Sequence, residues 1–142
     1  MEFTRDQFIV SGDKSRICPK FTHELLADTY WAKGRTLETV QETIANSFCF
    51  GLFADGEQIG FARAVTDFAT IAFLADVCIQ APFRNKGLGH FFVESIIAHP
   101  RLKKVAWILR TSQSQSLYSG FQFEIVEPHP SEGTWMYRKR EP

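Results

Sequence analysis

A short run of basic and glycine residues, Arg84–Gly89, carries the clearest chemical signal in the sequence. It follows a strand-like apolar run that ends at Ile79, and from Gly87 onward the apolar residues recur at helical spacing. The first N–H groups of a helix have no partner within the helix and lie at the positive end of its dipole, which suits them to phosphate oxygens. Arg84 and Lys86 add positive charge, and the glycines let a phosphate approach the main chain. The run therefore predicts an anion site.

Two other phosphate-binding motifs do not fit these residues. A Walker A loop needs Gly-Lys followed by Ser or Thr, whereas here Lys86 precedes Gly87. A dinucleotide fingerprint needs a third glycine three residues after Gly89, where the sequence has Phe92. The run alone would also fit a solvated surface turn, so its meaning depends on the elements around it.

Strand-like and helix-like runs alternate along the chain, which predicts a mixed α/β (α+β) fold. Helices are expected after Thr22 and Thr36, each as an N-cap, and after Gly87. The Asp55-Gly56 dipeptide favours a tight hairpin. Strands are expected at 8–10, 48–53, 59–65, 70–79, 105–109, 121–126 and 134–137, with a short helix at 113–118. The run 70–79 is nearly all apolar, as in a central strand buried on both faces, and Asp76 is its one charge.

Composition narrows the class of protein. The 142 residues fit a single domain, 1–142, with 44% hydrophobic residues to build its core. Sixteen basic and 16 acidic residues give no global field for nucleic acid. A charged N-terminus and the lack of an apolar run of about 20 residues predict a cytoplasmic protein that does not enter a membrane. Three scattered cysteines and four histidines without metal-ligand spacing predict no metal site.

Several segments in order resemble the GNAT acyl-CoA N-acetyltransferase superfamily. Arg84–Gly89, with the preceding Val77–Phe83, resembles its Q/R-x-x-G-x-G/A signature, and Leu117–Phe123 resembles its later L-Y-x-x-x-G-F segment. The Asp55-Gly56 hairpin resembles the paired strands before the signature. Leu74–Val77 and His99–Leu102 resemble a branch of small single-domain bacterial members.

The sequence departs from the family pattern at two places. Gln122 stands where glycine is usual, and Thr111–Ser116 replaces a segment that often carries Asp, Ala and His. Both departures bear on the preference for the acceptor more than on the cofactor.

The resemblance implies a mixed sheet splayed between its fourth and fifth strands, flanked by helices, with acetyl-CoA held in the splay. The pantetheine arm would pair with the main chain of Val77, Cys78 and Ile79. The phosphates would lie on the turn formed by Arg84, Asn85, Lys86, Gly87, Leu88 and Gly89.

The implied activity is direct transfer of an acetyl group from acetyl-CoA to a primary amine of a small molecule or protein, within a ternary complex. The second interpretation, motivated by the two departures, is a catalytically weak acyl-CoA sensor or interaction module. Relatives often dimerise, and the last strands, with Trp135 and Met136, suggest a homodimer.

Acetyl transfer needs a polarised thioester carbonyl, an unprotonated amine and a proton for the departing thiolate. A backbone N–H near Cys78 or Ile79 is the expected polarising donor. Tyr118, which matches the family's tyrosine, is the candidate acid, and the alternative is an aromatic side chain packed in the core.

Three further side chains have two interpretations each. Asp76 could be the base or hold the amine, or it could form a structural salt bridge. Tyr30 and Trp31, expected at the end of the first helix, resemble an aromatic wall on the acceptor side but could equally pack in the core. Cys78 has no activating neighbour in sequence and is interpreted as a small strand residue rather than a nucleophile.

Overall fold

The computed structural model describes residues 2–127 and 133–140. Within these residues one mixed sheet of eight strands has the order β1-β2-β3-β4-β5-β6-β8-β7. The strands are β1 (Glu2–Arg5), β2 (Phe8–Ser11), β3 (Phe48–Ala54), β4 (Glu57–Thr66), β5 (Ile71–Ile79), β6 (Ala106–Thr111), β7 (Glu124–Glu127) and β8 (Thr134–Arg138). β5 and β6 are parallel, and the other neighbouring strands are antiparallel.

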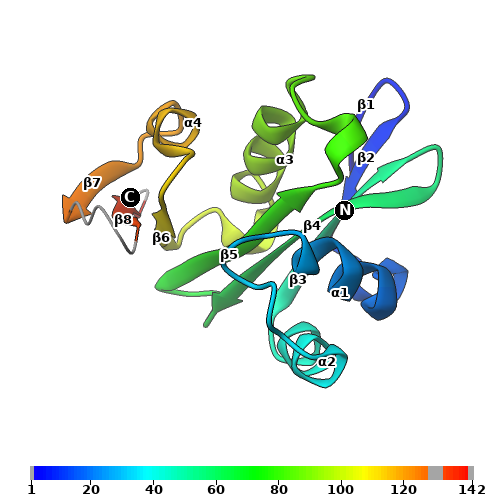
Figure 1. The fold of residues 1–142 in the computed structure, drawn as a ribbon. Coiled ribbons are helices and arrows are strands. Elements are labelled where there is room, and N and C mark those ends of the chain that lie inside the picture. The colour runs from blue at the N-terminus through cyan, green and yellow to red at the C-terminus, as the bar shows by residue number, and fades with distance from the viewer. Residues whose placement is uncertain (1, 128–132, 141–142) are drawn as a thin grey trace.

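Helices cover both faces of this sheet. They are α1 (Pro19–Ala27), α2 (Leu37–Ala45), α3 (Leu88–Ile97) and α4 (Gln115–Ser119), with short 3-10 turns η1 (Lys14–Arg16), η2 (Ala81–Phe83) and η3 (Pro100–Leu102). Figure 1 shows α1 and α2 on one face and α3 and α4 on the other. The predicted mixed α/β sheet flanked by helices is confirmed. β1 was not expected, so the predicted fourth and fifth strands are β5 and β6.

The two helices of the first face begin differently. Thr36 caps α2 as predicted, because its hydroxyl accepts the Thr39 N–H at 3.1 Å. The prediction that Thr22 caps α1 is wrong: the cap is Cys18, and Pro19 occupies the first helical position, where its missing N–H costs nothing. The helix ends at Ala27, so Tyr30 lies in the connection to α2 instead of on the helix.

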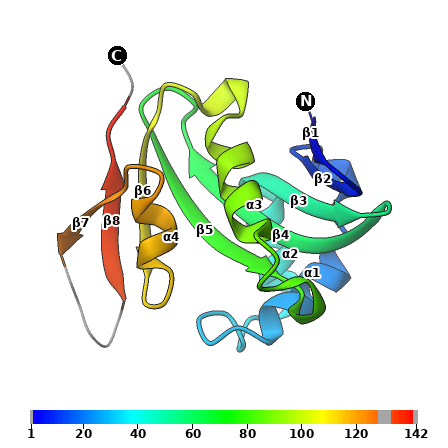
Figure 2. The same ribbon diagram turned by 90° about the horizontal axis from the view of Figure 1, so that it is seen from above.

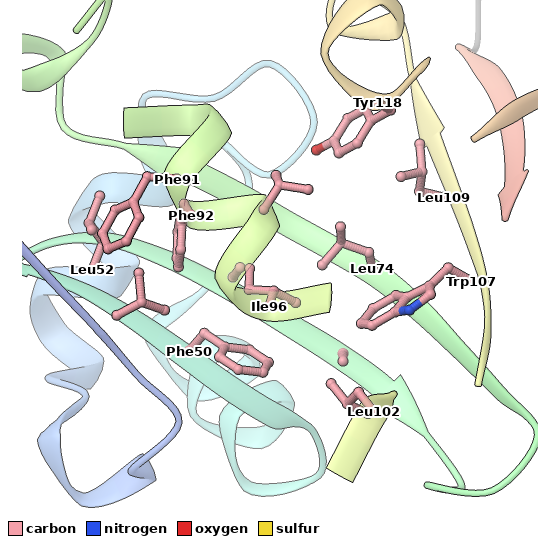
Figure 3. Packing of buried hydrophobic residues seen from close by; sticks show 14 of the residues in the cluster. Phe50, Leu52, Leu74, Phe91, Phe92, Ile96, Leu102, Trp107, Leu109 and Tyr118 are labelled. Atoms are coloured by element: carbon pink, nitrogen blue, oxygen red, sulfur yellow. The ribbon is translucent and has the colours of Figure 1, made fainter. Parts of the chain in front are cut away.

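The hairpin between β3 and β4 is confirmed. Asp55 and Gly56 both have positive φ, 51° and 85°, as a tight two-residue turn with the twist of the sheet requires. The paired strands contribute Phe50 and Leu52 to the core below α3. Figure 3 shows these side chains beside Phe92 and Ile96 of the helix. Full burial of side chains of this size contributes about 2 kcal/mol each.

A bulge in β5 exchanges the faces to which its side chains point. Arg63 of β4 pairs with Ala75, but Phe61 pairs with Cys78, so β5 has one extra residue between them. Asp76 lies there with a φ of 58°. Leu74 packs with the α3 cluster, whereas Cys78 packs with the cluster of α1 and α2. Strict alternation would place both on one face, so the bulge is what turns Asp76 toward α1 and α2.

No helix within the described part of the chain is long and apolar enough to cross a bilayer.

Candidate active site

The central sheet opens between its two parallel strands. β5 and β6 pair only where Ile71–Phe73 meets Ala106–Ile108, and beyond Phe73 the strands diverge (Figure 2). The predicted splay between the fourth and fifth strands is confirmed. From Leu74 to Ile79 the edge of β5 that faces β6 has no partner strand, so its main-chain groups are available to a ligand. Val77, Cys78 and Ile79 lie along this edge.

A cavity of about 300 Å³ occupies the splay. Its lining comes from β5, from β6 and the segment that follows it, from Tyr118 on α4, and from Tyr30, Trp31 and Arg35 between α1 and α2. α4 lies on the α3 face of the sheet, and the α1–α2 connection belongs to the opposite face. The cavity therefore joins the two faces. Two reactants could enter from opposite sides and meet within the sheet.

The glycine-containing turn opens α3, as the sequence predicts. Gly87 is the N-cap with a φ of 75°, and Asn85 also has a positive φ, 63°. The turn is exposed, while Leu88, the first helical residue, is only 2% exposed and anchors the helix in the core. The Arg84 Nε–H donates to the carbonyl oxygen of Ile79 at 2.8 Å, which ties the turn to the end of β5. This geometry presents unpaired helical N–H groups beside the splay.

The two glycines of the turn have different roles. Gly87 has the left-handed conformation that L side chains rarely adopt. Gly89 does not, and a Cβ built on it would come no nearer than 3.9 Å to another atom, Leu117 Cδ2. The fold therefore does not need a glycine at position 89. Its missing side chain leaves room at the helix N-terminus, where a pyrophosphate would approach the main chain.

Asp76 forms the centre of a buried charged cluster. Its side chain is 2% exposed, and its Oδ2 accepts hydrogen bonds from Arg35 at 2.6 Å and Arg63 at 2.7 Å. Its Oδ1 accepts the Trp31 indole N–H at 2.9 Å. Burial acts to raise the pKa of Asp76, but the hydrogen bonds and charges of the two arginines outweigh it and lower the pKa. Both oxygens of the Asp76 carboxylate are thus engaged. The contacts with the arginines are the structural salt bridge that was one of the two interpretations from the sequence.

Tyr118 is both buried and directed toward the cavity. It is 7% exposed and packs edge-on against Phe123 with ring centroids 5.6 Å apart. Figure 3 shows its hydroxyl turned toward β5. Burial raises the pKa of the phenol, so the group stays protonated, and within the described residues nothing hydrogen-bonds the hydroxyl. The side chain can therefore pack in the core and still donate a proton into the splay.

Tyr30 and Trp31 form a wall of the cavity on the α1–α2 side. They are 57% and 43% exposed, and their rings meet edge-on at 5.2 Å between centroids. The Tyr30 hydroxyl forms a hydrogen bond with Ser112 Oγ, from the segment after β6. Tyr30 and Ser112 both line the cavity. Core packing, the alternative for Tyr30 and Trp31, does not fit their exposure.

The family follows from residues 18–123, which match the acetyltransferase (GNAT) family. The chain belongs to this family. A solved GNAT-family protein of Xanthomonas campestris pv. campestris is 37% identical and superposes with a TM-score of 0.80, covering 84% of this chain and 85% of that one. An uncharacterized N-acetyltransferase of Gracilaria tenuistipitata var. liui is 31% identical over 121 residues, 80% of this chain and 66% of the relative. Both agree with the resemblance inferred from the signature.

More distant solved structures share the fold of this GNAT acetyltransferase. One from Elizabethkingia anophelis, with acetyl-CoA bound, has a TM-score of 0.66 at 16% identity and covers 95% of this chain and 99% of that one. An aminoglycoside 6'-N-acetyltransferase complexed with coenzyme A has a TM-score of 0.74 at 15% identity and covers 94% and 97%. At these identities the likeness extends to the fold alone.

Arg5 is a residue of this GNAT chain that the sequence did not single out. Its Nη2 lies 3.7 Å from the position a Cβ would take on Gly87, and its guanidinium carbon lies 5.1 Å from the centroid of the Phe91 ring. β1 thus brings a third cation to the turn that already carries Arg84 and Lys86. No sequence signal identifies it, because β1 is too short for its alternation to predict a strand, and the contact spans about 80 positions.

The remaining candidates are inert or dispersed. Burial raises the pKa of the Cys78 thiol to about 12, which agrees with its interpretation as a small strand residue rather than a nucleophile. Burial likewise raises the pKa of Cys49 to about 11. Among the residues that the structure describes, no cluster of His, Cys, Asp and Glu is arranged to hold a metal ion. His129, one of the four histidines, lies outside the described residues.

Proposed function

We propose that this chain is an N-acetyltransferase that transfers an acetyl group directly from acetyl-CoA to a primary amine in a ternary complex. One observation carries the proposal: a cavity joins both faces of the sheet at the splay, and a helix-opening glycine turn follows the unpaired end of β5. The turn suits an anionic cofactor, and the cavity brings its reactive end to an acceptor from the other face.

Several groups of the chain fit acetyl-CoA. The unpartnered edge of β5 at Val77, Cys78 and Ile79 offers main-chain groups to the pantetheine amides. The turn from Arg84 to Gly89 offers N–H groups and positive charge to the phosphates, and the open space at Gly89 fits their approach. Solved relatives of the same fold hold acetyl-CoA or coenzyme A, which supports the same ligand here.

Acetyl-CoA supplies an acetyl group activated as a thioester. Transfer forms a C–N bond to the amine and breaks the C–S bond, so the amine loses a proton and the sulfur gains one. We assign the proton for sulfur to the Tyr118 phenol, which then recovers a proton from solvent. A main-chain N–H of the β5 edge near Cys78 polarises the carbonyl.

Asp76 fits a positioning role better than that of a base. Its oxygens already accept hydrogen bonds from Trp31, Arg35 and Arg63, and the lowered pKa of the carboxyl makes it a weak base. It is also the only carboxylate among the described residues that line the cavity. We therefore propose that Asp76 holds the aromatic wall and Arg35 in place, and that the amine proton leaves through solvent.

The proposal is tested first by cofactor binding. Saturating acetyl-CoA should raise the melting temperature of the purified chain by several degrees, because a ligand selective for the folded state stabilises it. Gly89→Ala should fold with equal or higher stability, since alanine favours helices, yet lose most of this shift. Gly34→Ala is the matched control for the cofactor, because a Cβ there meets nothing within 4 Å and Gly34 lies in the α1–α2 connection instead of in the turn before α3. An unchanged shift in Gly89→Ala would contradict the assigned cofactor site.

Turnover decides between an enzyme and a sensor. The alternative, a catalytically weak acyl-CoA sensor or interaction module, predicts the same thermal shift but no acetylated product with any amine. Product formation, measured by mass spectrometry over a panel of amines, therefore separates the two. The homodimer remains a prediction, motivated by the outer strand β7, which exposes Ile125 and Val126.

A further inference from the structure

The charges that line the cavity are mostly positive. Among the described lining residues the charged side chains are three arginines, Arg35, Arg63 and Arg110, and one carboxylate, Asp76. Both oxygens of Asp76 already accept hydrogen bonds, two of them from arginines. An acceptor with several ammonium groups would therefore find no free anion in this wall. It would instead meet an excess of guanidinium groups.

Arg110 is the arginine with free donors on the β6 side. Its guanidinium carbon lies 5.3 Å from the centroid of the Trp135 ring, and the side chain is exposed. In the described part of the chain no carboxylate pairs with it and no acceptor takes its hydrogen bonds. Contact with an aromatic face restrains a guanidinium while leaving its N–H groups available. Arg110 is thus held at the cavity without a partner.

The other two arginines of the lining differ in the number of hydrogen bonds that they donate and in their exposure. Arg63 donates to both Asp76 and Ser47 and its side chain is 15% exposed. Arg35 donates to Asp76 through one nitrogen, and its side chain is 25% exposed at the cavity. The Arg35 carbonyl is hydrogen-bonded by His23 Nε2 at 2.9 Å, which fixes its main chain. Arg35 therefore adds positive potential on the side opposite β6.

We propose that the acceptor is a small primary amine that also carries a carboxylate, such as an amino acid, with its carboxylate bound by Arg110. This inference rests on the proposed acetyl transfer. A guanidinium binds a carboxylate through two parallel hydrogen bonds, which fixes orientation as well as charge. The carboxylate on Arg110 leaves the amine free to reach the splay. A cavity of about 300 Å³ is at the small end of ligand sites, which favours a compact acceptor.

The test compares acceptors that differ only in the carboxylate. Pairs are L-phenylalanine with L-phenylalaninamide and with 2-phenylethylamine, and the corresponding sets built on leucine and valine. We expect kcat/KM for the carboxylate members to exceed that of their partners by about tenfold or more, as lost charged hydrogen bonds dictate. Amine basicity alone predicts a higher kcat/KM for the amino-acid amide than for the amino acid. The α-amine of the amide is less basic, so a larger fraction of it is unprotonated at neutral pH.

Variants of Arg110 locate the effect. For each pair of acceptors, Arg110→Gln should bring the ratio of the two kcat/KM values toward one. It should do so by raising KM for the acceptor that carries the carboxylate, with little change in KM for acetyl-CoA. Arg110→Lys should restore part of the preference, since it keeps the charge but loses the fork geometry. Arg101→Gln is the matched control: this arginine lies 3.8 Å from the Phe68 ring centroid, away from the cavity, and should leave every ratio unchanged.

Binding is also measured without turnover, as the further thermal shift that each acceptor, or its acetylated product, gives at saturating coenzyme A. A larger shift with the carboxylate members that Arg110→Gln removes supports the inference. Equal shifts and equal ratios within the pairs, preference for polyamines, or ratios unaffected by Arg110→Gln overturn it. If acetyl-CoA itself gives no shift, the proposed function fails. If it binds and amines without a carboxylate are acetylated equally well, only this inference fails.

Discussion

At the scale of single residues, Tyr118 joins packing and chemistry. Its ring belongs to the buried cluster while its hydroxyl is free of described partners, and burial raises the pKa of its phenol. Tyr118→Phe keeps the ring and removes only the proton donor. We expect kcat to fall about 10- to 100-fold, as for loss of a general acid, while the thermal shift with acetyl-CoA is retained.

The control for this variant is Tyr137→Phe, because Tyr137 is an exposed tyrosine on β8 outside the cavity lining. Steady-state kinetics from pH 6 to pH 10 provide the readout. Because the phenol stays protonated across this range, no alkaline loss of kcat should arise from Tyr118. A Tyr118→Phe enzyme with the parent's kcat at every pH would remove the tyrosine from the mechanism.

Asp76 predicts how stability depends on acidity. Its pKa is lowered in the folded state relative to 3.8, so the unfolded chain binds the proton more readily. The stabilisation from this carboxylate is therefore complete above the unfolded pKa and is lost as pH falls through the folded pKa. Asp76→Asn leaves two arginines without their anion and should cost about 3 kcal/mol of unfolding free energy at pH 7.

Urea unfolding of the parent and of Asp76→Asn, between pH 7 and pH 3, checks both statements. The difference in unfolding free energy between the two proteins should narrow at the acidic end, because there the unfolded parent takes up a proton at Asp76 more readily than the folded parent does. A difference that stays constant over the whole range would show that the charge of Asp76 contributes nothing.

At the scale of elements, the sequence predicts what local chemistry decides. The Asp55-Gly56 hairpin, the Thr36 cap of α2 and the start of α3 at Gly87 all depend on turn and cap residues that are visible in the sequence. The cap of α1 was missed because Cys18 replaces the usual oxygen acceptor, its Sγ accepting the Phe21 N–H at 3.5 Å. Here the local signal fails because an unusual residue takes the capping role.

The rest of the site depends on pairing between distant segments. The β5 bulge could not be predicted, because a strand that is apolar on both faces has no alternation to reveal a one-residue slip. The single charge of Asp76 within this apolar run was the one irregularity that the sequence showed there. The approach of Arg5 to Gly87 and the bond between Tyr30 and Ser112 likewise exist only once the sheet and its connections are in place.

Gln122 shows that a departure from a family pattern can preserve the backbone. It has a φ of 68° after α4, the left-handed conformation for which glycine is suited. This conformation costs a non-glycine residue about 1 kcal/mol or more, so Gln122→Gly should raise stability by a net ~0.5 kcal/mol after the added freedom of the unfolded chain. Turnover should not change.

Thermal unfolding measures this difference, expected as a rise in melting temperature of about 2 °C. Gln80→Gly is the matched control, because Gln80 has a φ of −57°, where glycine only adds freedom to the unfolded chain and should lower stability. Equal effects of the two substitutions would mean that the left-handed conformation at position 122 carries no strain.

At the scale of the whole molecule, the proposed function assigns the two reactants to opposite faces of the sheet. Arg5 of β1 and the turn before α3 lie together where we propose that the cofactor phosphates bind. The helix α4 lies on the same face of the sheet as α3, and the connection between α1 and α2 forms the opposite wall of the cavity (Figures 1 and 2). The bulge of β5 lies between them and directs Asp76 to the second face. This arrangement predicts that a substitution on the cofactor side changes the affinity for acetyl-CoA, and that one on the α1–α2 side changes the affinity for the acceptor.

Arg5→Gln and Tyr30→Ala test this separation. Arg5→Gln removes a cation beside Gly87 and should raise KM for acetyl-CoA about fivefold, less so at high salt, because the lost attraction is electrostatic. Tyr30→Ala removes an exposed part of the aromatic wall and should raise KM for the acceptor with little change for acetyl-CoA. Substitutions that are far apart and share no partner act additively in free energy. Each KM of the double variant should therefore equal the parent value multiplied by the factors that the two single variants give for that KM. Strong coupling in this cycle would mean instead that the two faces respond as one site.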